Sequence, residues 1–236
     1  MKVKVITAIL GASLSLLAIS SHASHTVYYG EDLGLGEATR LLTHPNADAA
    51  RALFFANLGG VAVGTENFDT IANGTGAPLP INFPGFGTAT LEGNGYVSYV
   101  PSGTNGVGRY PVSGNNYWES SGVFSIEFSK PVAAFGFYGI DIGDFNGQVK
   151  VTLSNGVDEV YNIPNTINAM GGGVLYWGII DNQHTYTKLT FGNTGSGVDQ
   201  FGFDDFTVGG VVPVPASLPL LLSGLVGLAA LMRRKN

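Results

Sequence analysis

The feature that most limits how this chain can fold is an alternation that runs from Val61 to Val208. Short apolar runs are separated there by clusters of glycine, asparagine, serine and proline, and the whole chain has 35 glycines. Apolar runs of roughly four to eight residues between such clusters are typical of β-strands. The pattern predicts ten strands, at residues 64–68, 88–92, 96–100, 123–128, 132–138, 148–153, 159–163, 175–180, 188–191 and 201–208.

One of these runs shows the strand periodicity directly. Phe124, Ile126 and Phe128 alternate with polar residues, as in a strand with one buried face. The run 201–208 carries apolar residues on both faces, which predicts a central strand. Together the runs predict a mainly β fold over residues 61–210, an antiparallel two-sheet sandwich that is jelly-roll-like.

Residues 24–60 are predicted to form a lead segment that contains one helix, at 45–58. Asn46 is the predicted cap of this helix, and a pair of glycines follows its end. The apolar residues of the helix share one face, so we expect it to pack on the side of the sandwich. Tyr28 and Tyr29 mark a candidate start for a further strand.

Residues 1–23 read as a secretory signal peptide, with Lys2 and Lys4 before an apolar centre and small residues before the cleavage point. Residues 24–211 keep six of the eleven basic residues and all 17 acidic residues, so their formal charge is −11. A domain this acidic is not expected to bind nucleic acid. The chain has no cysteine, which excludes disulfides and thiol chemistry.

The C-terminal segment 211–236 combines a motif, an apolar run and a basic end. The apolar run 218–232 would form a helix of about 22 Å, short of the roughly 30 Å of a bilayer core. It predicts a C-terminal transmembrane helix that anchors the chain weakly, with the basic end on the cytoplasmic side. The motif residues are Val212, Pro213, Val214, Pro215 and Ala216, and the basic residues are Arg233, Arg234 and Lys235.

This ending resembles the PEP-CTERM sorting signal of Gram-negative bacteria, in its VPxPA variant. The usual motif has glutamate where this chain has Val214. The resemblance implies that an exosortase-like membrane enzyme is the partner that reads and processes the tail. It also implies export to the cell envelope with a transient inner-membrane anchor, and then a place at the cell surface or in the extracellular matrix.

Internal segments resemble a domain that recurs in PEP-CTERM proteins. These segments are residues 45–51 followed by 66–69, residues 131–138 with 141–145, and residues 201–206. The resemblance implies a secreted β-sandwich without an assigned activity.

The sequence contains no motif that marks a catalytic nucleophile, since it lacks cysteine and has no serine within Gly-x-Ser-x-Gly. Its histidines, His22, His25, His44 and His184, do not have the spacing of a zinc motif. Two carboxylates that meet only in the folded chain could serve glycoside hydrolysis, so a polysaccharide-acting enzyme stays an alternative.

Acidic residues near the predicted first and last strands of the sandwich are candidate calcium ligands, because Ca²⁺ prefers carboxylate and other hard oxygen ligands. Glu66 and Asp69 lie at the first of these strands, and Asp204 and Asp205 lie in the last. First and last strands of jelly rolls are often neighbours, so these acids could converge. Asp204 and Asp205 are expected to point to opposite faces of their strand.

A second calcium candidate is the cluster of Asp141, Asp144 and Asn146, in a glycine-rich loop. The alternative for both groups of acids is that they accept hydrogen bonds from backbone N–H groups and stabilise turns.

Exposed aromatic rings could stack on sugars, and Tyr117 and Trp118 are the predicted stacking residues. Trp118 follows the polar loop 114–116 and is expected to be exposed. Trp177 lies in an apolar run and is expected in the core.

These patterns predict an exported, non-enzymatic protein of the cell surface or extracellular matrix that is associated with exopolysaccharide. The first alternative is a calcium-dependent carbohydrate-binding module, and the second is a polysaccharide-acting enzyme.

Overall fold

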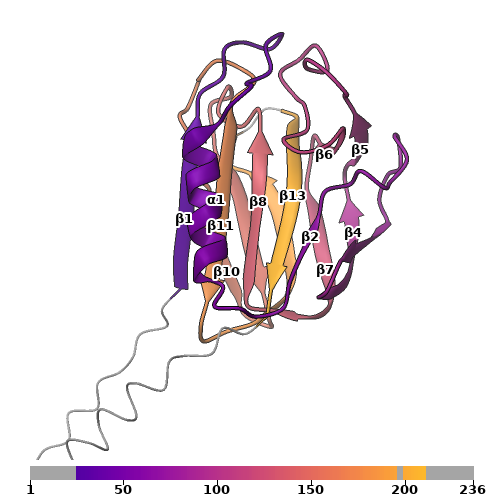
Figure 1. Ribbon diagram of the computed structural model, residues 1–236, viewed down its shortest axis with the longest axis vertical. Coiled ribbons are helices and arrows are strands. Elements are labelled where there is room, and N and C mark those ends of the chain that lie inside the picture. The colour runs from indigo at the N-terminus through magenta and orange to yellow at the C-terminus, as the bar shows by residue number, and fades with distance from the viewer. Residues whose placement is uncertain (1–24, 196–198, 211–236) are drawn as a thin grey trace, which may run out of the picture.

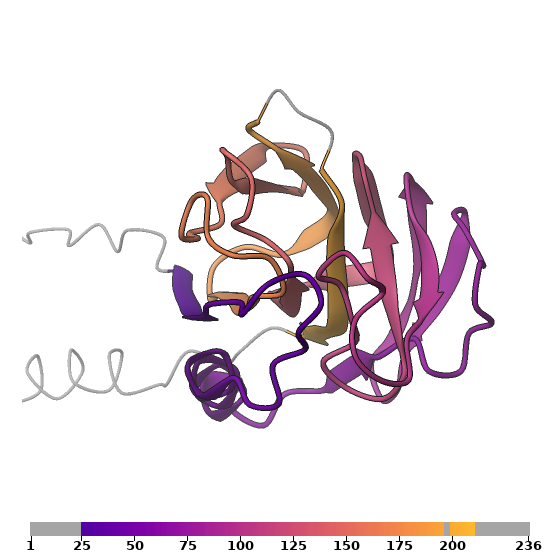
Figure 2. The ribbon, with the colours of Figure 1, turned by 90° about the horizontal axis from the view of Figure 1, so that it is seen from above.

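The computed structural model describes residues 25–195 and 199–210, and within these ranges the apolar runs form two antiparallel sheets and one helix. The sheets lie face to face, as the view from above in Figure 2 shows, and they enclose the main core. The predicted mainly β, two-sheet sandwich with one helix is therefore confirmed.

The seven-stranded sheet has the order β1-β11-β8-β13-β6-β5, and β2 also pairs with β13. β13 pairs with β8 along one side and with β6 and then β2 along the other. The prediction of a central strand at 201–208 is thus confirmed. The strands are β1 (His25–Asp32), β2 (Val63–Glu66), β5 (Tyr96–Tyr99), β6 (Asn116–Ser120), β8 (Ala134–Ile140), β11 (Val174–Asp181) and β13 (Phe201–Gly209).

The six-stranded sheet has the order β10-β9-β12-β7-β4-β3. Its strands alternate between buried and more exposed residues, as expected for a sheet with one face on the core. They are β3 (Leu79–Phe83), β4 (Gly87–Gly93), β7 (Phe124–Val132), β9 (Val149–Ser154), β10 (Asp158–Asn162) and β12 (Tyr186–Asn193).

Each of the ten predicted strands overlaps an observed one, and β1 contains the candidate residues Tyr28 and Tyr29. The pattern missed β3 and β6. β3 contains Pro80, which breaks the expected strand composition but is tolerated at the edge of a sheet, where β3 lies. β6 follows directly on a polar loop, so the same residues that predict a turn conceal the start of the strand.

The helix α1 (Pro45–Asn57) packs on the outer face of the seven-stranded sheet, over β1, β8 and β11 (Figure 1). Its Phe54 has no exposed surface and fits against Gly178, where an added Cβ would lie 2.8 Å from the Phe54 ring. The helix therefore buries a second apolar layer outside the sheet, which explains why strands such as β8 are buried on both faces.

The start of α1 is held by a residue distant in the sequence. The N-cap residue His44 makes no side-chain cap hydrogen bond, and Asn46 lies inside the helix, so the prediction that Asn46 is the cap is wrong. Asp32, at the end of β1, accepts hydrogen bonds from the N–H groups of Asn46 at 3.3 Å and Ala47 at 2.9 Å. A carboxylate at this position also favours the positive end of the helix dipole.

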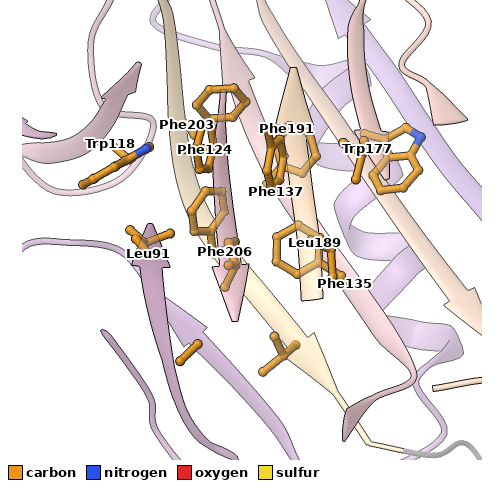
Figure 3. Packing of buried hydrophobic residues seen from close by; sticks show 14 of the residues in the cluster. Leu91, Trp118, Phe124, Phe135, Phe137, Trp177, Leu189, Phe191, Phe203 and Phe206 are labelled. Atoms are coloured by element: carbon orange, nitrogen blue, oxygen red, sulfur yellow. The ribbon is translucent and has the colours of Figure 1, made fainter. Parts of the chain in front are cut away.

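The core between the sheets consists largely of phenylalanine rings from β7, β8, β12 and β13 (Figure 3). Phe124 and Phe191 stack with their ring centroids 4.5 Å apart and their planes 3° apart. Phe206 lies among them and has no exposed surface. The residues that pack here are the apolar members of the alternating runs.

The predicted signal peptide, sorting motif, transmembrane helix and basic tail lie outside the described residues. In residues 25–195 and 199–210, we find no helix that combines the length and the apolar character needed to cross a membrane.

Candidate functional site

Glu66 and Asp69, which are predicted calcium ligands, accept hydrogen bonds from backbone N–H groups of other segments. Glu66 accepts one from Asn82 at 3.3 Å, in β3. Asp69 accepts two, from Asn115 at 2.7 Å and from Asn116 at 3.1 Å. The two carboxylates therefore connect the end of β2 to β3 and to the loop that leads into β6.

Asp204 and Asp205 lie at an irregularity of β13, where the register with β8 shifts and Asp205 has a φ of 50°. Asp204 accepts the N–H of Ser113 at 2.9 Å, and Asp205 accepts the hydroxyl of the same serine at 2.7 Å. The expectation that they point to opposite faces is wrong, because the left-handed residue interrupts the strand alternation. Burial raises the pKa of the Asp204 carboxyl and the charge of Asp205 raises it further, while its N–H bonds act in the opposite direction.

The pairing of β2 with β13 places Glu66 opposite Phe206, so the predicted first and last strands are neighbours. The hydrogen bonds of these four acids fit the alternative given by the sequence, in which the carboxylates stabilise turns and loops instead of binding calcium. Calcium binding at them stays a prediction.

Asp141 and Asp144 are close enough for their charges to interact, and Asp141 also pairs with Arg109. Asp141 Oδ2 lies 3.2 Å from Nη1 of Arg109, and Oδ1 accepts the N–H of Gly172 at 2.7 Å. Asp144 Oδ1 is buried and has no hydrogen-bond partner among the described residues. Burial, with the charges of Asp141 and Asp199, raises the pKa of Asp144 to about 7. Arg109 thus compensates Asp141, whereas Asp144 is held partly neutral by its surroundings.

The predicted stacking residues Tyr117 and Trp118 both have 0 % exposed surface, so the expectation that Trp118 is exposed is wrong. Trp118 packs into the core with its ring 6.0 Å from that of Phe124. Tyr117 faces the outer layer and donates a hydrogen bond to Glu119 at 2.8 Å. Neither ring is open to a sugar in this structure. Trp177 is buried, as predicted.

One group of three metal-binding side chains occurs in the part of the chain that the structure describes. It consists of Glu159, Asp181 and His184, whose ligand atoms lie within 4.8 Å of one another. It contains none of the six acids predicted from the sequence. No motif spacing joins these three residues, because they come from β10, from β11 and from the turn that follows it.

The outer face of the six-stranded sheet carries a polar row that the sequence patterns did not single out. Glu92, Ser125, Thr190 and Thr152 are successive register partners on β4, β7, β12 and β9. Strands lie roughly 4.8 Å apart, so the row is roughly 14 Å long. The helix α1 packs on strands of the other sheet.

Two shallow grooves meet on this face at Val123 and Thr190. One has a volume of about 220 Å³ and includes Lys150, and the other has a volume of about 260 Å³ and includes Glu92 and Lys188. Val123 is 62 % exposed between them. The face therefore offers hydroxyls, charges of both signs and an apolar side chain in one depression.

The residues of this face can be recognised in the sequence as the polar positions that alternate with apolar ones in the predicted strands. Ser125, Thr152 and Thr190 each occupy such a position. Their alignment depends on strand order and register, which the separate runs do not contain.

No protein-family model matches the chain, and no curated protein matches it. Among solved structures, the K2 cleaved adhesin domain of Lys-gingipain is similar over 62 % of this chain and 99 % of its own, with 15 % identity and a TM-score of 0.43. A mutant of a family 29 carbohydrate-binding module matches over 79 % of this chain and 92 % of its own, with 14 % identity and a TM-score of 0.27. The xylan-binding domain of a family 22 carbohydrate-binding module matches over 60 % of this chain and 99 % of its own, with 13 % identity and a TM-score of 0.30. All three TM-scores are low, so these similarities do not assign a function to this chain.

Proposed function

We propose that this chain is an exported, non-catalytic domain that binds a neutral polysaccharide on the outer face of its six-stranded sheet. The observation that carries the proposal is the pair of partly exposed hydroxyls from Thr190 and Thr152 on adjacent strands, with Ser125, 7 % exposed, beside them on the next strand. Hydroxyls both donate and accept hydrogen bonds, as the hydroxyls of sugars do. The whole row from Glu92 to Thr152, roughly 14 Å long, suits a chain of sugars better than a single one.

The charges on this face favour a neutral ligand. Lys188 and Glu127 form an ion pair at 2.8 Å, and Lys150 and Glu92 lie in the two grooves. Because positive and negative groups are interspersed, neither a polyanion nor a polycation gains from the whole face. Val123 adds an exposed apolar surface for the C–H groups of a sugar ring.

The double substitution Thr190→Val and Thr152→Val is expected to weaken polysaccharide binding about tenfold or more. Valine keeps the branched shape of threonine and removes two hydroxyls, each of which contributes about 0.5–1.5 kcal/mol through a hydrogen bond. Affinity gel electrophoresis of the purified chain in gels with a soluble β-glucan or galactan measures the effect.

Thr26→Val is the matched control, because Thr26 is exposed on β1 of the other sheet. If no neutral polysaccharide retards the chain, or if the double variant is retarded like the original, the proposal is wrong.

Repeating the gels with Ca²⁺ and with a chelator tests the calcium-dependent alternative. Release of reducing ends from the same polymers would favour the polysaccharide-acting enzyme instead.

We further propose that the chain reaches the cell surface or extracellular matrix through processing of its C-terminal segment. The support is the sequence order of motif, apolar run and basic end in residues 211–236. Pro215→Ala is expected to leave a full-length, membrane-held precursor, because the sorting enzyme no longer recognises the motif. Immunoblots of membrane and secreted fractions measure this. Pro101→Ala, at an exposed proline of the folded domain, is the control. Normal maturation of the Pro215 variant would contradict the proposal.

A further inference from the structure

Three side chains with metal-binding atoms meet where the edge strand β10 of one sheet lies near the end of β11 in the other. Glu159 belongs to β10, the edge strand of the six-stranded sheet. Asp181 is the last residue of β11, in the seven-stranded sheet, and His184 lies in the turn that follows. Their ligand atoms all lie within 4.8 Å of one another.

The turn after β11 holds Asp181 and His184 in a defined arrangement. Asp181 has only 1 % of its surface exposed, and its Oδ1 accepts the N–H groups of Gln183 at 2.8 Å and His184 at 2.9 Å. Its Oδ2 lies 3.1 Å from Nδ1 of His184. One carboxylate oxygen is therefore used by the turn, and the other faces the imidazole.

The hydroxyls of Tyr161 and Tyr186 orient the carboxylates of Glu159 and Asp181. Tyr161 donates to Glu159 Oε2 at 2.9 Å. Tyr186 is buried, donates to Asp181 Oδ2 at 2.5 Å and lies 3.3 Å from Glu159 Oε2. Hydrogen bonds of this kind to ligand carboxylates are typical of metal sites, where they fix the direction of the ligand atoms.

The formal charges of this group leave room for a cation. Within residues 25–195 and 199–210, no lysine or arginine forms an ion pair with Glu159 or Asp181, and His184 is the basic residue paired with Asp181. The His184 side chain is 41 % exposed, so an ion can enter from solvent. Two carboxylates at this separation repel each other unless a positive charge lies between them.

We propose that Glu159, Asp181 and His184 bind one divalent transition-metal ion, and that Zn²⁺ fits the donor set best. One imidazole nitrogen and two carboxylate oxygens suit Zn²⁺, whereas Ca²⁺ takes oxygen ligands. Tetrahedral ligands at about 2.0–2.2 Å from zinc lie roughly 3.3–3.6 Å apart. The 3.1 Å between His184 Nδ1 and Asp181 Oδ2 needs only a small adjustment to match this.

The ion would connect the two sheets. Glu159 is a residue of the six-stranded sheet and Asp181 of the seven-stranded one, so a shared ion would join the edge strand β10 to the end of β11. The chain has no cysteine and so no disulfide that could do this. A structural metal is another way to cross-link an exported domain.

Titration of the purified, tag-free, chelator-treated full chain with ZnCl₂ tests the proposal by calorimetry. We expect one saturable equivalent of zinc, with a rise in Tm on addition. His184→Ala and Glu159→Gln are each expected to weaken this binding at least tenfold, and CaCl₂ is not expected to compete for it. Glu159→Gln keeps the shape of the side chain, and circular dichroism verifies that both variants fold.

His44→Ala is the matched control, because His44 pairs with Asp48 at 2.8 Å but belongs to no group with a third ligand. It is expected to bind zinc like the original chain. The proposal is wrong if the original chain takes up no stoichiometric zinc, or if the two site variants bind it as tightly. In either case the three residues form a hydrogen-bonded network without an ion.

Discussion

An Arg109→Ala variant is expected to lose about 3–5 kcal/mol of its free energy of unfolding, since it leaves buried carboxylates without their counter-charge. The side chain of Arg109 is 8 % exposed, and those of its partners Glu119 and Asp141 are 4 % and 2 % exposed. Nε lies 3.0 Å from Glu119, and Nη1 lies 3.2 Å from Asp141. Nη2 also donates to the side chain of Gln200 at 2.9 Å.

The size of this effect comes from desolvation rather than from the attraction between the charges. Without the guanidinium, Glu119 and Asp141 must stay charged in a poorly solvated place or take up protons. Arg109→Lys is expected to recover only part of the loss, because an ammonium group cannot reproduce the planar fork that reaches both carboxylates and Gln200.

Urea unfolding at neutral pH measures the change. Lys188→Ala is the matched control. The distance between Lys188 and Glu127, 2.8 Å, is similar to the distances from Arg109 to its partners, but the two side chains are 41 % and 52 % exposed. Exposed pairs contribute about 0–1 kcal/mol. A loss of 1 kcal/mol or less in the Arg109→Ala variant would show that the buried network does not stabilise the fold.

A Phe206→Ala variant of the otherwise unchanged chain is expected to lose about 3–5 kcal/mol of its free energy of unfolding. Phe206 has no exposed surface, and its ring centroid lies 5.4 Å from Phe68 and 5.6 Å from Phe135. Figure 3 shows it between rings of both sheets. Truncation removes these contacts and leaves a cavity that neighbouring rigid rings fill poorly.

Thermal and urea unfolding of the same sample measure this loss. Leu42→Ala is the control, because Leu42 is 92 % exposed and its truncation is expected to change the unfolding free energy by less than about 0.5 kcal/mol. Equal stability of the two variants would mean that the aromatic cluster does not form the core of the folded chain.

Much of the fold could be predicted because it depends on local periodicity. The run that contains Phe124 and Ile126 places apolar side chains on one face, and the structure buries those same residues. The run 201–208 carries apolar residues on both faces, and β13 lies in the interior of its sheet. Burial of one or both faces leaves its pattern in the residues themselves, so no knowledge of the partner strands is needed.

The candidate sites could not be predicted in the same way. The sequence identifies Asp204 and Asp205 as adjacent acids, but only the shift in register brings both to Ser113. Similarly, Trp118 follows a polar loop, and it is buried because the loop returns to a sheet whose two faces are both covered.

The sequence by itself therefore determined the class of fold and the positions of most strands, because these follow from the alternation of apolar and polar residues. The tertiary structure alone decided which polar side chains meet. The hydroxyls of Thr190 and Thr152 are neighbours because of the strand order, and Glu159, Asp181 and His184 meet because β10 of one sheet lies near the end of β11 in the other. Such groups form between residues far apart in the chain, and pairing over long sequence separations leaves no local pattern.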